Sequence, residues 1–145
     1  MSATGETDLT RLLAAMEPAL NPGEYVFCSG PATATVPVAQ VLGFFREAEG
    51  LTLMLAREVA DGHGLSYDYV AAWLTLRVHS ALAAVGLTAA VAAALARQGI
   101  SCNVVAAYYH DHLFVAKADA ARALAVLQDL SAAAASHTNQ PTPYF

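Results

Sequence analysis

The second half of the chain alternates between strand-like and helix-like apolar patterns, and this succession limits its fold more than any other feature. Strand, helix, strand, strand and helix patterns follow one another at residues 72–79, 86–98, 102–109, 113–116 and 119–130. Gly99 stands where the left-handed cap of the first helix is expected, and Asp119 can cap the second helix. The second half is therefore predicted to be a small β-α-β-β-α unit.

This order lacks only the final strand of a ferredoxin-like βαββαβ module. The first half reads α-β-β-β-α and can be a permuted or strand-sharing copy that supplies the missing edge, because an open sheet edge is a pairing hazard. We therefore predict an α+β fold with two ferredoxin-like modules in tandem and antiparallel sheets. The predicted units are an N-terminal module over 1–70, a C-terminal module over 71–130 and a flexible tail of low complexity over 131–145.

Local patterns in the first half support the interpretation that it is a second copy of the module. Leucines and a methionine recur at helical spacing over residues 9–16, and residues 57–63 read as a short helix. A hairpin is predicted from 44–47 and 51–55, with Glu49 and Gly50 in its tight turn. Residues 30–37 are expected to form a loop between two prolines.

Composition excludes several classes of function. Twelve Asp and Glu against seven Lys and Arg give a formal net charge of −5, and the seven bases are scattered along the chain. No basic cluster can neutralise several phosphates, so neither nucleic acid nor an anionic membrane surface is expected as a partner. The N-terminus has no basic start followed by an apolar stretch, so we expect a cytoplasmic protein. Cys28 and Cys102 lie in strand-like runs and read as buried free thiols.

Several stretches resemble a known family. Residues 78–91 are similar to the first strand, loop and helix start of an ACT domain, and Gly99–Val105 to the entry to its second strand. Tyr108–Val115 resembles the following hairpin of aspartokinase-like ACT modules. Upstream, Tyr25–Phe27 and Phe45–Leu53 resemble the partner half of small bacterial tandem ACT proteins. The likeness extends over roughly residues 8–130.

The resemblance implies an allosteric regulatory module that binds a free amino acid where two modules meet. It implies no catalytic residue and no cofactor, a partner protein that the sequence does not identify, and compatibility with a homodimer. The ligand would lie between the loop after the first strand, the start of the following helix and the facing hairpin. Carried onto this chain, the ligand-binding residues are Glu49, Gly50, Leu51, Ser80, Ala84, Val85, Gly86, Leu87, Thr88, Ala107, Tyr108, His110 and Asp111.

The residue types fit an amino acid on physical grounds too. Free N–H groups at a helix N-terminus near Gly86 suit a carboxylate, and Glu47, Glu49 and Asp111 are the anions available for an ammonium group. The loop departs from the usual ACT pattern, since it is longer and has no acidic residue. Gly86 also fits close packing of a helix on a sheet, and Glu49–Gly50 a solvated turn.

Two other functions remain open. His110 and His112 are two residues apart on one strand, and with His79 they could hold a metal for hydrolysis, although no metal-binding motif supports this. A turn with both histidines bonded to backbone explains them more simply. A non-catalytic assembly module with a vestigial pocket is the main alternative to an amino-acid sensor. A panel of free amino acids in a thermal-shift assay would separate the two.

Overall fold

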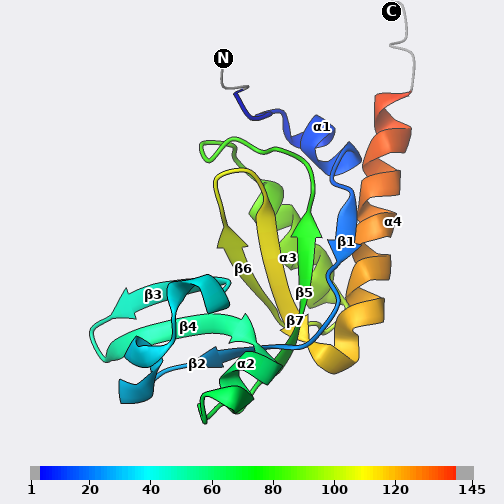
Figure 1. Ribbon diagram of the computed structural model, residues 1–145. Helices are drawn as coiled ribbons and strands as arrows, with labels where there is room; N and C mark the ends of the chain where they lie inside the picture. Colours follow the sequence, from blue (N-terminus) through cyan, green and yellow to red (C-terminus); the bar gives the residue numbers. More distant parts are fainter. Residues whose placement is uncertain (1–3, 140–145) are drawn as a thin grey trace, which may run out of the picture.

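The computed structural model describes residues 4–139. Within these residues, seven strands form one continuous antiparallel sheet in the order β3-β4-β2-β5-β7-β6, and β1 also pairs with β5 (Figure 1). The strands are β1 (Pro18–Leu20), β2 (Tyr25–Cys28), β3 (Gly43–Glu47), β4 (Gly50–Ala56), β5 (Val70–Leu76), β6 (Cys102–Ala106) and β7 (Asp111–Ala116). The helices are α1 (Leu9–Ala14), α2 (Arg57–Gly62), α3 (Leu87–Arg97) and α4 (Ala120–Thr138), with short 3-10 helices η1 (Pro31–Thr35), η2 (Val38–Gln40) and η3 (Lys117–Asp119).

Strand β5 belongs to both halves of the sheet. Its first residues pair with β2, and its last three pair with β1, so that Tyr25 lies opposite Ala71 and Leu20 opposite Leu74. The order β6-β7-β5-β1 then completes one four-stranded module, and β3-β4-β2-β5 completes the other. The prediction that the first half supplies the missing edge strand is confirmed. The predicted boundary between residues 70 and 71 falls at the start of this shared strand.

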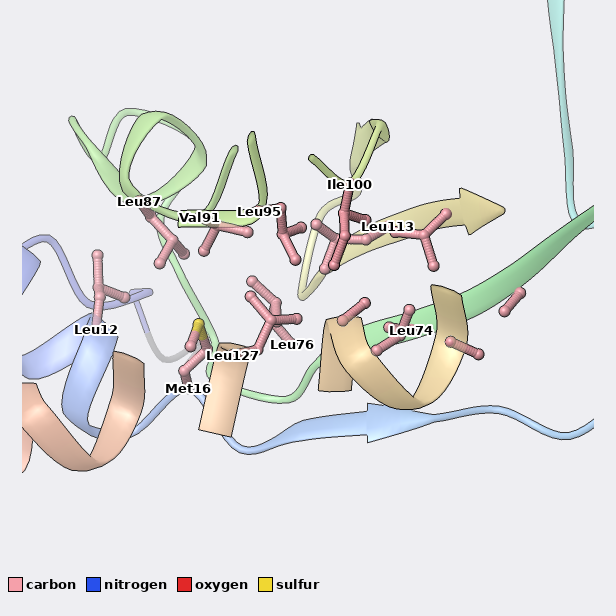
Figure 2. Close-up of a cluster of buried hydrophobic side chains, with 14 residues drawn as sticks. Leu12, Met16, Leu74, Leu76, Leu87, Val91, Leu95, Ile100, Leu113 and Leu127 are labelled. Carbon is pink, nitrogen blue, oxygen red and sulfur yellow. The ribbon is translucent and has the colours of Figure 1, made fainter. Parts of the chain in front are cut away.

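Helices α1, α3 and α4 cover one face of the C-terminal half. Alternate residues of β5 and β7 point to that face, so their leucines and valines meet the apolar sides of the helices. Figure 2 shows these side chains converging between the sheet and the helices. The fully or nearly fully buried core residues are Leu12, Met16, Ala72, Leu74, Leu76, Leu87, Val91, Leu95, Ile100, Leu113, Val115, Ala120, Ala123 and Leu127.

The N-terminal half has a thinner layer over its sheet. Where the second module has α3, the first has only η1 and η2, and α2 is six residues long. Thr33 fixes η1 over β4, since its buried hydroxyl lies 2.9 Å from the carbonyl oxygen of Leu51 and 2.7 Å from that of Gly30. A smaller core of residues such as Val26 and Leu55 lies beneath. This layer leaves part of the sheet surface open.

Some predicted boundaries were wrong. Residues 131–138 continue α4 rather than forming a flexible tail, because the alanine run favours helix and Ser131 Oγ donates to the carbonyl oxygen of Ala14, 3.1 Å away. The remaining predicted tail, 140–145, lies outside the described residues. Strand β1 was missed, β5 ends before Arg77, and β6 ends before Ala107.

Candidate functional site

Part of the predicted C-terminal site does come together. Ser80, Ala84, Leu87, Thr88 and Asp111 line one small cavity of about 60 Å³. Such a volume is well below the roughly 150 Å³ of an apolar cavity that holds benzene. The cavity by itself is therefore too small for a whole amino acid.

Asp111 is not the turn residue that the sequence predicted. It begins β7, is 7% exposed, and one carboxylate oxygen accepts a hydrogen bond of 3.1 Å from Ser80 Oγ. The first residues of α3, Leu87 and Thr88, line the same cavity. A resident carboxylate at this place already supplies the negative charge that a helix N-terminus favours. A ligand carboxylate would have to compete with Asp111 here.

The surrounding fold requires a glycine at position 86. Gly86 is the N-cap of α3 with φ of 104°, a left-handed conformation that favours glycine. A Cβ built on Gly86 would lie 3.0 Å from Cδ2 of Leu9 in α1. The close approach of α1 therefore explains this glycine without a ligand.

The remaining predicted residues of this half lie at its margin. Val85 is 83% exposed, and Ala107, Tyr108 and His110 belong to the turn between β6 and β7. Tyr108 and Ser80 line an adjacent hollow of about 370 Å³. His110 Nδ1 lies 3.3 Å from the carbonyl oxygen of Val78.

The other predicted wall, Glu49–Leu51, lies elsewhere. Leu76 pairs with Asp111 at one end of β5, whereas β2 pairs at the other end and runs away from it toward Cys28. Cys28 pairs with Leu53 of β4, and the start of β4 at Gly50 extends past this pair, still farther from β5. The Glu49 turn and the Ser80 cavity are therefore at opposite ends of the sheet, and one chain does not bring them together.

Gly50 and Leu51 instead border a second cavity, which we call the β3 hollow. It has a volume of about 530 Å³ and lies between η1–η2 and the hairpin β3–β4. Its lining is mostly apolar, with one cation and one anion: Thr33, Ala34, Val36, Val38, Val41, Phe44, Arg46, Glu47, Gly50, Leu51 and Leu53. Glu47 Oε1 accepts a hydrogen bond from Thr52 Oγ1, and Arg46 forms no ion pair within residues 4–139.

The two cavities occupy equivalent positions in the two modules. Each lies between the loop that follows the module's first strand, β2 or β5, and the hairpin that forms its edge. In the C-terminal module α3 and Asp111 fill this place, whereas in the N-terminal module it remains open. Sequence reasoning named Glu47 as an available anion but missed the apolar residues of the lining between Thr33 and Phe44. The signal for them was a series of Val and Ala residues on both sides of Pro37.

No arrangement typical of nucleophilic or metal catalysis is found among residues 4–139. The Ser80 hydroxyl is bonded to Asp111 rather than to a histidine. Cys28 and Cys102 form no disulfide. Burial raises the pKa of the Cys28 thiol, and that of Cys102 to about 11, so both thiols are protonated near neutral pH. The described residues contain no group of three or more His, Cys, Asp or Glu side chains that could hold a metal ion.

Among residues 4–139, no helix is both long enough and apolar enough to cross a membrane.

Comparison with known proteins matches both halves of this two-module fold to one family. The description of each matching family model is ACT domain, over residues 4–72 for one and 69–129 for the other. A structure of a protein of unknown function from Vibrio cholerae, described as a possible transport protein, is 46% identical. The match covers 85% of this chain and 95% of that one, with a TM-score of 0.74. No curated protein matches the chain.

More distant structures share the fold. A protein from Agrobacterium tumefaciens is 19% identical, with a TM-score of 0.60 over 79% of this chain and 87% of that one. The ligand-free regulatory subunit of aspartate kinase from Thermus thermophilus is 10% identical, with a TM-score of 0.60 over 80% and 97%. Shared strands, equivalent cavities and these matches define a protein of two ferredoxin-like modules. The chain belongs to the ACT-domain family, with two ACT domains in tandem.

Proposed function

We propose that this protein is a non-enzymatic regulator that senses a free amino acid, and that the amino acid binds in the β3 hollow. The observation that carries the proposal is the pairing of a mostly apolar hollow of about 530 Å³ with Arg46 and Glu47 at its border. Binding sites for small molecules usually combine apolar walls with a few polar groups that fix orientation. An amino acid brings an anion, a cation and a side chain, which Arg46, Glu47 and the apolar walls can each receive.

The position of the hollow at an open edge supports a site between modules. Consecutive residues of a strand point to opposite faces of the sheet. Arg46 and Glu47 nevertheless both border the hollow, because β3 is an edge strand and the hollow extends to this edge. A second module laid against β3 would close the hollow from outside. Within residues 4–139 no strand pairs with the outer side of β3, so that module would belong to a second chain. The regulated partner would be another protein.

The proposed site differs in part from the one expected from sequence. Gly50 and Leu51 remain in it. Of the three anions named from sequence, Glu47 rather than Glu49 or Asp111 becomes the proposed partner of the ammonium group. The group around Ser80 and Asp111 becomes the second candidate location. Two unpaired cysteines also fit the reducing conditions of the cytoplasm.

A panel of the twenty amino acids in a thermal-shift assay tests the proposal. One of them, or a small related set, is expected to raise the melting temperature, because a ligand that binds only the native state stabilises it. Calorimetric titration then measures its affinity for the Arg46→Gln and Glu47→Gln variants. Each should bind about ten- to hundredfold more weakly, which corresponds to about 1.5–3 kcal/mol for one charge-assisted hydrogen bond.

Two control variants locate the site. Glu49→Gln changes an exposed charge outside the hollow and should bind as the native protein does. Asp111→Asn tests the second location, and if it alone abolishes binding, the site lies around Ser80. If no amino acid stabilises the protein, the assembly module is the better description. The open edge and the exposed Phe44 and Phe45 of β3 are the observations that favour that alternative.

A further inference from the structure

The sheet face opposite the helices carries an aromatic cluster that is partly buried. Strand alternation turns Trp73 of β5 and both His112 and Phe114 of β7 to this face. Phe114 is only 3% exposed there, although the core of leucines and helices lies on the other face. Figure 1 shows the cause, since β2, β3 and β4 run across the direction of β5, β6 and β7. The sheet bends over its own helix-free face.

The aromatic rings on this face hold one another in place through edge-to-face contacts. Tyr25 and Trp73 pack edge to face, with ring centroids 5.3 Å apart and an interplanar angle of 81°. Phe27 and Phe114 form a second pair with the same separation and angle. Such pairs contribute attraction in addition to the stabilisation that comes from burying their apolar area. The aromatic wall is therefore already ordered before any ligand arrives.

A cavity of about 200 Å³ lies against this wall. Residues from the two margins of the sheet, Leu42 beside β3 and Val105 of β6, meet around it with Met54, Trp73, His112 and Phe114. Apart from the imidazole, no ionisable side chain lines it. An apolar cavity of about 150 Å³ is large enough to bind benzene. The volume therefore suits one substituted six-membered ring.

His112 gives the cavity one directional polar group. The Trp73 indole N–H donates to His112 Nδ1 at 3.0 Å, and an indole nitrogen can only donate. Nδ1 is therefore unprotonated, and the neutral imidazole carries its proton on Nε2. Within residues 4–139, Nε2 has no hydrogen-bond partner in the protein. The ring consequently offers an unused N–H donor in an otherwise apolar place.

We propose that this cavity is a second binding site, separate from the β3 hollow, for a neutral monocyclic aromatic molecule with one hydrogen-bond acceptor. The ring packs against Trp73 and Phe114, with the Met54 sulfur as a favourable neighbour of an aromatic ring. The acceptor receives the Nε2–H of His112. A charged ligand is excluded because no lining group compensates its desolvation.

Three probes of similar size test each part of the proposal on the full chain. Acetophenone has a ring and an acceptor, ethylbenzene has the ring alone, and benzoate adds a negative charge. Trp73 is the only tryptophan, so its indole N–H gives one unambiguous signal in ¹H–¹⁵N spectra. Acetophenone is expected to shift this signal saturably. Ethylbenzene should bind roughly two- to tenfold more weakly, as the loss of one neutral hydrogen bond implies, and benzoate should not bind.

Two neighbouring alanines supply a matched pair of variants. Ala107 lines the cavity, whereas its neighbour Ala106 does not, and both are exposed. Ala107→Leu and Ala106→Leu are therefore the same substitution inside and outside the cavity lining. Ala107→Leu should weaken acetophenone at least tenfold, and Ala106→Leu should leave its affinity unchanged. Val105→Phe fills the cavity from the strand itself and should have the effect of Ala107→Leu.

Three results would overturn the proposal. The first is the absence of any saturable shift of the Trp73 signal up to the solubility limit of acetophenone. The second is equal affinity for acetophenone and ethylbenzene, which would remove the role of His112. The third is unchanged binding in both Ala107→Leu and Val105→Phe. None of them bears on the amino-acid site, whose variants Arg46→Gln and Glu47→Gln lie outside this cavity.

Discussion

At the scale of single residues, Gly86 shows how a position that suggests a ligand site can be required by packing. Its left-handed φ of 104° costs a residue such as alanine about 1–2 kcal/mol, and Cδ2 of Leu9 lies 3.0 Å from where a Cβ would be. We predict that Gly86→Ala lowers the free energy of unfolding by at least that amount in urea denaturation. The matched control is Gly62→Ala at the end of α2, where nothing lies within 4 Å, and it should be neutral or slightly stabilising. Equal stability of the two variants would contradict the prediction.

His112 gives a second residue-scale prediction, on pH. Its pKa is lowered by burial and by the neighbouring His110, against the opposing effect of Asp111. The unfolded chain therefore binds this proton at a higher pH than the folded chain, and stability falls as the pH drops from 7 through the ordinary histidine range. Protonation of Nδ1 also breaks the bond from Trp73.

The urea midpoint between pH 7.5 and 5.5 measures this effect. His112→Asn keeps a polar side chain that does not titrate, so its midpoint should fall less over this range than that of the native protein. His137→Asn removes an exposed histidine of α4 and should leave the native slope. A His112→Asn protein with the native slope would assign the dependence to other groups.

At the scale of elements, α4 has a larger role than its sequence suggests. The residues after Leu130 were predicted to be a flexible tail, yet residues 131, 134 and 135 are partly buried, and Ser131 is hydrogen-bonded to the end of α1. We predict that a chain ending at Leu130 loses about 1–3 kcal/mol of stability, measured by thermal and urea unfolding. Ser131→Ala removes only the hydrogen bond and should cost less. A shortened chain with native stability would restore the flexible-tail interpretation.

Local patterns predicted most elements, because hydrophobic periodicity and turn residues act over short distances. The hairpin of β3 and β4, helix α3 and its cap at Gly99 were all predicted in this way. Strand β1 was not, since three residues beginning with Pro18 show no periodicity and become a strand only by pairing with β5. The expectation that Glu49 and Asp111 lie close together did not hold within one chain, for the same reason. Which ends of the sheet Glu49 and Asp111 occupy is decided by strand order and register, which a resemblance between local segments does not contain.

At the scale of the whole molecule, the outer sides of β3 and β6 are unpaired within residues 4–139, and the three-residue β1 pairs only with β5. Unpaired edges invite further strands, and β3 adds the exposed Phe44 and Phe45, the latter 68% exposed. A symmetric dimer formed through β3 would cover these rings and close the β3 hollow at once. The proposed amino-acid site and the assembly of the protein would then be one feature of the fold, because each chain would complete the site of the other.

We therefore predict a dimer in sedimentation velocity measurements, and its dissociation by Phe45→Lys, which places a charge at the centre of the proposed contact. Val85→Lys is the matched control, since Val85 is even more exposed but lies in the loop before α3. Because each copy carries a formal net charge of −5, salt should strengthen the dimer by screening their repulsion. The amino acid chosen by the thermal-shift panel should also favour the dimer, because a ligand that binds between two chains shifts their association by mass action. A protein that stays monomeric at all concentrations would place the site within one chain. Equal effects of the two lysine variants would show that the dimer contact does not lie at β3.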